Sequence, residues 1–271
     1  MARQVGTVAG AVALAREHQP LRDRLRLRWW RELLIIGTFY AVYSFIRNQF
    51  GSAAVDWTVA YENARAIIDV ERAIGLYHEA RIQSWFLGWD GFLRFWNVFY
   101  GLFHFAVTAL VLIFLYTRDP VAYPRWRTIG LVTTAMALIG FALFPLMPPR
   151  LLPDCGLYGA CLQGTGFVDT VTDIGGIWSF DSGAGEKLSN QYAAMPSMHF
   201  GWAAWSFLAL YPRLERPVAK AAIAIYPWLT MFAIIVTANH YWIDALGGAI
   251  ALGIGWVVGS AIHRDRAVLR R

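Results

Sequence analysis

Charged residues are scarce in this chain: Asp, Glu, Lys and Arg make up only 15% of its 271 residues, whereas a soluble globular domain carries about 25%. Lysine is nearly absent, because Lys187 and Lys220 are the only lysines among the 24 basic residues. Apolar residues make up 57% of the chain, and its mean hydropathy is +0.41. These values exclude a disordered chain, a fibrous chain and an ordinary cytosolic enzyme, and they are typical of a polytopic membrane protein.

Six stretches are long and apolar enough to cross a bilayer. A span needs about 20 mostly apolar residues, because the hydrocarbon core is about 30 Å thick and a helix rises about 1.5 Å per residue. The stretches are too long and too continuously apolar for barrel strands, so we predict an all-α protein with six transmembrane helices. Their approximate bounds are Leu33–Phe50, Phe92–Tyr116, Thr128–Met147, Ser197–Tyr211 (the shortest), Val218–Ala238 and Trp242–Ile262.

The basic residues predict how these spans are oriented. Seventeen of the 24 lie before the first span or after the second, fourth and sixth, and five lie in the two long stretches on the opposite side. By the positive-inside rule, the larger group and both termini are cytoplasmic. The predicted organisation is a basic N-terminal segment (residues 1–32), a six-helix membrane domain (residues 33–262) and a basic tail (residues 263–271). Residues 51–91 and 148–196 are then extracytoplasmic, and the first span is an uncleaved anchor.

The net charge of +6 is explained by this topology. Clustered arginines beside the spans favour contact with anionic lipids at the cytoplasmic face, and they do not indicate a nucleic-acid partner. The excess of arginine over lysine points to a GC-rich bacterial genome, so the expected location is the plasma membrane of a bacterium.

The two outer stretches differ in character. In residues 51–91, apolar residues recur at spacings of three and four, which predicts an amphipathic helix, or a pair with a bend at Gly75, on the outer membrane surface. Such a helix could cover the bundle or act as a lid. Residues 148–196 form a long loop, which is uncommon unless functional. The loop holds the only cysteines, Cys155 and Cys161, and we expect a small disulfide loop rather than a metal site.

Ionisable residues at membrane depth are costly, so they are the first candidates for chemistry. His199 opens the fourth span, while His240 and Asp244 lie where the fifth span gives way to the sixth. The six-span arrangement brings all three to the outer side. If a helix runs through His240 and Asp244, the carboxylate fixes the imidazole tautomer and leaves a lone pair for nucleophilic attack, with His199 as general acid. Ser197 is a good helix cap, and the free N–H groups after it can hold an anion. His104, inside the second span, is expected to bond to another helix.

The motif Pro-Ser-Met-His at His199, followed by His-Tyr-Trp-Ile-Asp at His240, resembles the type 2 phosphatidic acid phosphatase (PAP2) superfamily of membrane lipid phosphatases and phosphotransferases. Within it, the chain most resembles the branch of the fungal inositol phosphorylceramide synthase, the aureobasidin target, and its bacterial relatives. The resemblance implies that His240 attacks phosphorus and forms a phosphohistidine, that Asp244 orients it and that His199 protonates the leaving group. It also implies that no metal or other cofactor is used.

The chain departs from the phosphatase motifs of that superfamily in its fixed cations. Ile234 stands where those motifs carry an arginine, and their Lys-x6-Arg-Pro motif is absent. Pro148-Pro149-Arg150 resembles a Pro-Pro motif of the synthase-like branch. Lys187 could equally be an ordinary loop charge, Arg150 a topology residue, and Arg47 a side chain that snorkels to the outer interface. The candidate phosphate-binding residues are Arg150, Ser197, Lys187, Asn239 and Arg47.

The sequence therefore predicts an integral-membrane lipid phosphotransferase. It would move a head-group phosphate, of the inositol-phosphate type, from a membrane phospholipid to a lipid or polyol hydroxyl. Few fixed cations favour a singly charged phosphodiester donor over a phosphomonoester, whose charge is about −1.5 to −2. The alternatives are a PAP2-type phosphatase acting on phosphatidic acid or an isoprenoid (di)phosphate, a metal-dependent membrane hydrolase, and a non-enzymatic transporter or scaffold. A transporter needs a polar path, and the spans offer few charged groups to line one.

Overall fold

A computed structural model describes residues 27–49, 55–176 and 190–264 of the chain, without the side chains of 46–49. Within these residues the protein is helical and has no strand. The elements are α3 (Trp29–Gln49), α4 (Trp57–Ala73), α5 (Glu79–Ser84), α6 (Asp90–Arg118), α7 (Tyr123–Leu143), α8 (Thr170–Asp173), α10 (Met198–Leu210), α11 (Pro217–Val236) and α12 (Trp242–Ile262), with the 3-10 turns η1 (Pro149–Leu151) and η2 (Tyr211–Arg213).

Four helices, α6, α7, α11 and α12, are long and apolar enough to cross a membrane. They coincide with the second, third, fifth and sixth predicted spans, so the all-α membrane fold is confirmed at this level. Helix α3 covers the first predicted span but is not among the four. Helix α10 covers the fourth but has only 13 residues, which rise to about 20 Å. Six crossings and the orientation of the termini therefore stay predictions.

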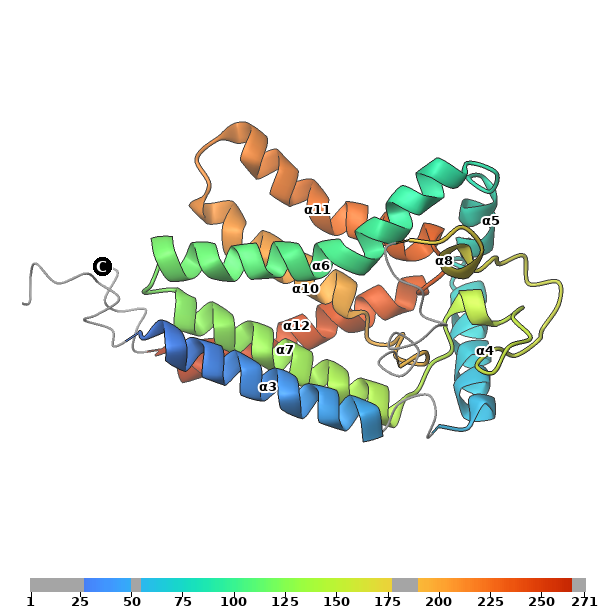
Figure 1. The fold of residues 1–271 in the computed structure, drawn as a ribbon, viewed down its shortest axis with the longest axis horizontal. Helices are drawn as coiled ribbons and strands as arrows, with labels where there is room; N and C mark the ends of the chain where they lie inside the picture. Colours follow the sequence, from blue (N-terminus) through green and yellow to red (C-terminus); the bar gives the residue numbers. More distant parts are fainter. Residues whose placement is uncertain (1–26, 50–54, 177–189, 265–271) are drawn as a thin grey trace, which may run out of the picture.

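The short helix α10 lies inside the bundle. Helices α3, α6 and α7 run along the long axis of the molecule (Figure 1), and α10 contacts α6, α7, α11 and α12. The buried Trp205 of α10 donates its indole N–H to the Trp126 carbonyl of α7 at 3.0 Å. A helix enclosed by protein need not match the bilayer thickness, because its end groups find partners in the protein rather than in lipid.

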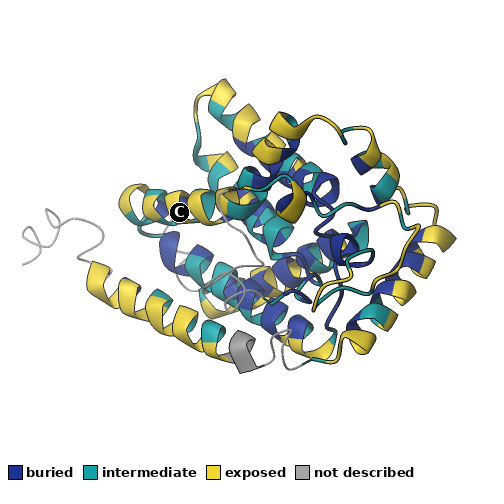
Figure 2. Ribbon diagram, turned by 45° about the vertical axis from the view of Figure 1, so that its right-hand side comes forward, coloured by how far each residue is buried: buried dark blue, intermediate teal, exposed yellow. Residues whose placement is uncertain are grey.

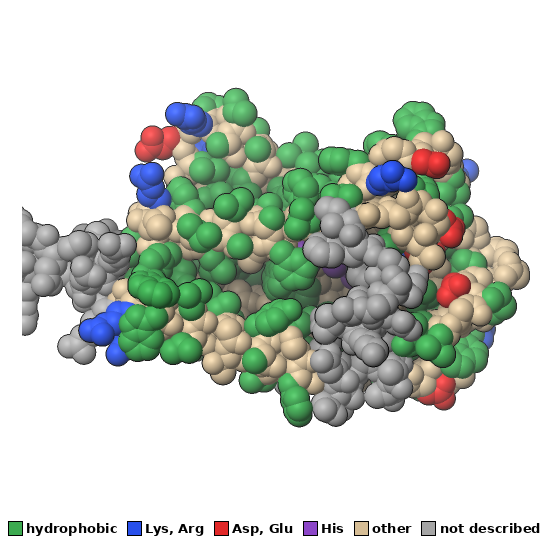
Figure 3. Space-filling view, viewed as in Figure 1, with side chains coloured by type: hydrophobic (Ala, Val, Ile, Leu, Met, Phe, Trp, Pro, Cys, Tyr) green, Lys and Arg blue, Asp and Glu red, His purple; other side chains and the backbone are tan. Residues whose placement is uncertain are grey.

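Burial and charge divide the molecule in the way a membrane protein requires. Buried residues gather between the inner helices, whereas α3 is exposed along most of its length (Figure 2). On the face shown in Figure 3, charged side chains gather at the two ends of the bundle, and the surface between them is mainly hydrophobic. The exposed large apolar residues of α3 suit a helix in contact with lipid. They are Trp29, Trp30, Leu33, Leu34, Ile35, Tyr40, Val42 and Phe45.

Helices α4 and α5 close one end of the bundle (Figure 1). Helix α4 is amphipathic, and it buries Ala60, Ala64, Ile67 and Ile68 against Leu146 and its neighbours. The helix ends at Ala73, and Gly75 follows in the turn with a φ of +74°, in the left-handed region that glycine adopts most readily. The expected helix pair with a bend at Gly75 is therefore present. We call α4, α5 and the turn between them the cap helices.

The long stretch after α7 is held by turns and backbone hydrogen bonds. Its described parts contain η1 and α8, and a disulfide joins Cys155 to Cys161. Leu146 N–H donates to the Tyr192 carbonyl (2.8 Å), and Arg150 N–H donates to the Ala238 carbonyl (2.8 Å). The first bond joins the beginning of the stretch to its end, and the second ties it to the turn after α11, so residues far apart in sequence meet at this end of the bundle.

The start of α10 packs directly on α12 because position 248 has no side chain. A Cβ at Gly248 would lie 2.3 Å from the backbone oxygen of Ser197, two residues before His199. Backbone atoms cannot yield to such an overlap as a flexible side chain can. Gly248 therefore fixes how closely His199 approaches the residues of α12.

We expect Gly248→Ala to push α10 away from α12 and to lower the melting temperature of the protein in detergent. Gly253→Ala in the same helix is the matched control, since a Cβ there meets nothing within 4 Å. The control should be neutral or stabilising, because alanine is favoured over glycine inside a helix by roughly 0.5–1 kcal/mol. Equal melting temperatures for the two variants would contradict the close packing of α10 on α12.

Candidate active site

Asp244, His240 and His199 form a chain of contacts where α11 gives way to α12. His240 Nδ1 lies 3.1 Å from Asp244 Oδ2, and His240 Nε2 lies 3.3 Å from His199 Nδ1. Asp244 is fully buried, and His240 is 2% exposed. A carboxylate only accepts hydrogen bonds, so Nδ1 of His240 carries the hydrogen and Nε2 of the neutral ring carries a lone pair that faces His199. The three residues proposed from the sequence thus lie in one cluster.

His240 does not lie on a helix, which corrects the expectation that His240 and Asp244 share a helix face. Helix α12 begins at Trp242, with Tyr241 as its N-cap and Asp244 in its first turn. Asp244 Oδ2 accepts from the Tyr241 N–H (2.9 Å) as well as from His240. The contact of His240 with Asp244 therefore comes from a capping arrangement. The carboxylate that orients His240 is itself held by the start of α12.

Ser197 couples the start of α10 to α12. Its hydroxyl accepts from the Phe200 N–H (3.4 Å), and its own N–H donates to the Asp244 carbonyl (2.8 Å). The residue is fully buried. As the sequence suggested, Ser197 is the N-cap of this helix. Accepting this bond leaves the O–H hydrogen of Ser197 able to donate, so that hydroxyl and the backbone N–H groups can both hold an anion at this end of α10.

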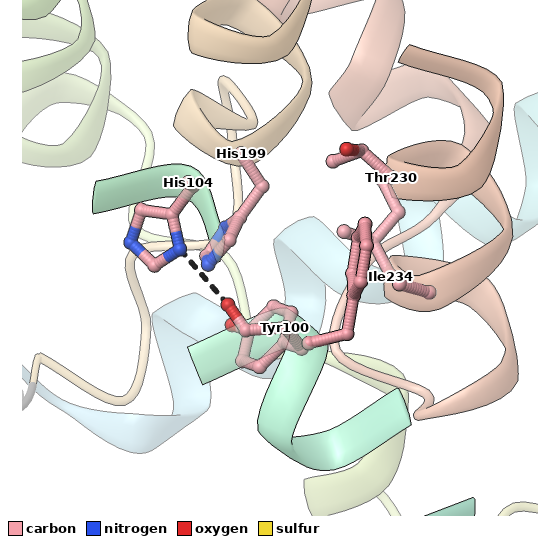
Figure 4. A pocket seen from close by; sticks show the side chains of 7 residues that line it. Tyr100, His104, His199, Thr230 and Ile234 are labelled. Carbon is pink, nitrogen blue, oxygen red and sulfur yellow. Dashed lines mark hydrogen bonds between the residues drawn. The ribbon is translucent and has the colours of Figure 1, made fainter. Parts of the chain in front are cut away.

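His199 is enclosed by two rings from α6. Tyr100 stacks on it with ring centroids 4.1 Å apart, and His104 meets it edge-on, also at 4.1 Å. Nδ1 of His104 donates to the Tyr100 carbonyl at 2.9 Å, as Figure 4 shows. Because a carbonyl only accepts, this bond fixes the tautomer of His104 and leaves its Nε2 as the acceptor nitrogen. His104 was expected to bond to another helix. Its hydrogen bond to Tyr100 instead stays within α6, and its ring packs on His199 of α10.

A narrow pocket lies beside His199, between α6, α10 and α11. In Figure 4, Thr230 and Ile234 of α11 face His199 and Tyr100 across it. The Thr230 hydroxyl donates to the Tyr226 carbonyl within its own helix (3.0 Å). Ile234, the residue in place of an expected arginine, is fully buried in this wall. The wall of α11 next to His199 is therefore apolar.

Arg150 is a buried cation next to the turn that carries His240, and three side chains bond to it. Its Nε donates to Asn239 Oδ1 at 3.0 Å, and its terminal nitrogens bond to Asp169 and Gln191. The residue is 3% exposed as part of this network. Asn239 directly precedes His240, and its amide nitrogen donates to Thr237. Asn239 therefore holds Arg150 beside the histidine turn and does not project freely toward a substrate.

Two further predicted phosphate-binding residues lie wholly or partly outside the residues that the structure describes. Lys187 lies outside the residues that the structure describes, and Arg47 lies in α3 with its side chain outside them. Sequence reasoning did not name Asp169, Gln191 or Tyr100. No motif marks these residues, and they meet the site only through the fold. His104 did carry a signal, since an ionisable residue at membrane depth is a functional candidate by default.

Across the described part of the chain, no three His, Cys, Asp or Glu side chains group in a way that could hold a metal ion. The predicted metal-free chemistry remains a prediction. What the cluster provides is an imidazole with a fixed tautomer, a second imidazole at 3.3 Å and a buried arginine next to the same turn. Such a set suits attack by a histidine on an electrophilic phosphorus with proton transfer by its neighbour.

The fold and this site define a helical membrane protein with a buried Asp–His–His chain. The PAP2 superfamily matches residues 65–258, a range that holds all three of these residues, and the chain belongs to that superfamily. Membership indicates an enzyme of the lipid phosphatase or phosphotransferase type. Neither a curated protein nor a solved structure matches the chain significantly.

The contribution of the buried ion pair of Arg150 and Asp169 to stability can be tested by removing first one charge and then both. Arg150→Gln leaves Asp169 without its cation, and removing one partner of a buried ion pair costs about 3–5 kcal/mol. We therefore expect a large drop in melting temperature. Adding Asp169→Asn, which keeps an oxygen to cap α8, should recover part of the loss. If the double variant is no more stable than Arg150→Gln alone, the ion pair is not what holds Arg150.

Proposed function

We propose that the protein is an integral-membrane lipid phosphotransferase that works through a phosphohistidine at His240. The observation that carries the proposal is the chain of contacts from Asp244 through His240 to His199. Asp244 fixes the proton of His240 on Nδ1, so the Nε2 lone pair is the nucleophile. Membership in the PAP2 superfamily favours an enzyme over a transporter or scaffold.

The reaction proceeds in two steps. In the first, His240 Nε2 attacks the phosphorus of the donor, the bond from phosphorus to the diacylglycerol oxygen breaks, and protonated His199 gives its proton to that oxygen. In the second, the now neutral His199 takes the proton of an acceptor hydroxyl, whose oxygen attacks the phosphorus and releases His240. Each step needs the phosphoryl group between the two imidazoles, so it replaces their direct contact.

The donor is a phosphodiester of the phosphatidylinositol kind. Arg150 already faces the carboxylate of Asp169, and the wall of α11 next to His199 is apolar at Ile234. A dianionic monoester is poorly held by so little net positive charge in a medium that solvates ions weakly. A diester carries one negative charge, which Arg150 and the N–H groups at the start of α10 can balance. The acceptor is the hydroxyl of a lipid or a polyol.

In this proposal the bundle crosses the membrane six times, with α3 and α10 as the first and fourth crossings and both termini in the cytoplasm. The active site and the cap helices then lie on the outer side of the plasma membrane. The clustering of basic residues between the spans supports this orientation.

Single cysteines in a background without Cys155 and Cys161 test the orientation. An impermeant thiol reagent should label a cysteine at exposed Arg65 in α4 on intact cells. It should label one at exposed Arg216, before α11, only after the membrane is opened. Labelling at position 216 from outside would overturn the topology and with it the outer location of the site.

Separate incubation with phosphatidylinositol plus an alcohol acceptor, and with phosphatidic acid, tests the reaction class. We expect head-group transfer from the diester and little phosphate release from the monoester. His199→Ala should lower the rate by about 10²–10⁴, the usual contribution of a general acid, and His240→Ala by at least as much. Rapid phosphate release from phosphatidic acid with an inert diester would reassign the protein as a phosphatase. Full activity of His240→Ala would refute the phosphohistidine.

A further inference from the structure

Two buried acids of the cap helices contact the start of α12, directly after His240. Glu71 lies in the last turn of α4, and Glu79 is the first residue of α5. Both side chains belong to residues that are fully buried. Acids are seldom buried so completely unless each of their oxygens has a partner. The proposed reaction assigns no role to either of them.

Three carboxyl groups converge on three successive N–H groups at the start of α12. Tyr241 N–H donates to Asp244 (2.9 Å), Trp242 N–H to Glu79 Oε1 (3.5 Å) and Ile243 N–H to Glu71 Oε1 (2.9 Å). The first N–H groups of a helix have no partner within the helix, and the helix dipole favours negative charge there. Glu71 and Glu79 therefore complete from outside the capping that Asp244 begins from within.

The second oxygens of the two acids face a different situation. No donor among the described residues reaches Glu71 Oε2 or Glu79 Oε2. Their first oxygens accept from neighbouring N–H groups of one turn, which brings the two carboxyls side by side. Two adjacent carboxylates in a buried place repel strongly, and one proton between them removes the repulsion and supplies the missing donor.

We propose that Glu71 and Glu79 share one proton, and that the pair positions His240 by holding the start of α12 from the cap helices. The pairing does not depend on the proposed reaction; the positioning of a nucleophile does rest on it. Burial, followed by the hydrogen bond and the charge of Glu79, raises the pKa of Glu71 to about 9. Such an acid keeps its proton at neutral pH.

The titratable groups around the pair affect the pH at which it releases this proton. Asp244 in the first turn of α12 and its N-cap Tyr241 face the pair, as does Tyr77 from the turn between α4 and α5. Arg72 lies over the Tyr77 ring at 4.8 Å. Asp244 adds negative charge and so favours retention of the shared proton. Arg72 is exposed to solvent and acts mainly on Tyr77.

The sign of the pH effect on stability follows from the raised pKa. The folded protein holds the proton from acid pH up to about 9, whereas an unfolded glutamate releases it near pH 4.3. The pair's contribution to stability is therefore complete at acid pH and is lost as the pH rises toward 9. Melting temperature should fall by roughly 2–4 °C per pH unit over that range.

The test compares melting temperatures at several pH values between 5 and 9.5 for the wild type, Glu71→Gln and Asp69→Asn. Glutamine mimics the protonated acid, because its oxygen can accept from Ile243 and its amide can donate to Glu79. We expect Glu71→Gln to lose most of the pH slope and to melt above the wild type near pH 8.5. Asp69 is on the same helix with a side chain that is 71% exposed, so Asp69→Asn should keep the wild-type slope.

Turnover measurements at pH 7 test the positioning role. Glu71→Ala should lower kcat by up to about 10² with a smaller change in KM, and Glu71→Gln should retain much more of kcat than Glu71→Ala. Glu79→Gln, from the other side of the pair, should also flatten the pH slope of melting. A wild-type slope no steeper than that of Glu71→Gln would overturn the shared proton. Equal losses of kcat in the Glu71→Gln and Glu71→Ala variants would overturn the positioning role.

The two readouts separate this inference from the proposed reaction. The melting profiles are measured without substrate, so they do not depend on the proposed reaction. If no lipid tested is turned over while the slope difference is present, the proposed reaction fails and the shared proton stands. If turnover is found but the wild type and Glu71→Gln have the same pH slope of melting temperature, only the shared proton is refuted.

Discussion

The start of α12 is the point on which this structure depends. Its first N–H groups have no acceptor within the helix and lie where water is scarce, so each needs an acceptor from elsewhere in the protein. Asp244 supplies one acceptor from within the helix, and the cap helices supply two more through Glu71 and Glu79. The same Asp244 oxygen also holds His240. Capping of a helix and orientation of the candidate nucleophile are therefore one arrangement.

Several other elements are attached to this turn. Ser197 donates its N–H to the Asp244 carbonyl, which fixes the start of α10 and so the place of His199. Asn239 holds Arg150, which in turn bonds to Asp169 of the long loop. A residue with any side chain at position 248 would separate α10 from this turn. Loops that are distant in sequence thus act together, because each satisfies polar groups that lipid and apolar side chains cannot.

Much of this arrangement could be predicted from the sequence. Apolar runs located the four membrane-length helices. The predicted six-span arrangement placed His199 and His240 on the same side of the membrane. The contact of His240 with Asp244 was predicted for the wrong reason, since a helix cap rather than a helix face produces it. Arg150 and Asp169 could not be paired in advance, because the conformation of a long loop has no period to read. Glu71 did leave a signal: it follows Ile67 by four residues, on the apolar face of α4.

In the proposed reaction, His240 becomes covalently bonded to phosphorus during turnover. Rapid quenching of the wild-type protein at alkaline pH, with a donor labelled in its head-group phosphate and no acceptor present, tests it directly. We predict acid-labile label on the peptide that contains His240, and none in His240→Ala. Turnover without label on the protein, or label on a different residue, would contradict it.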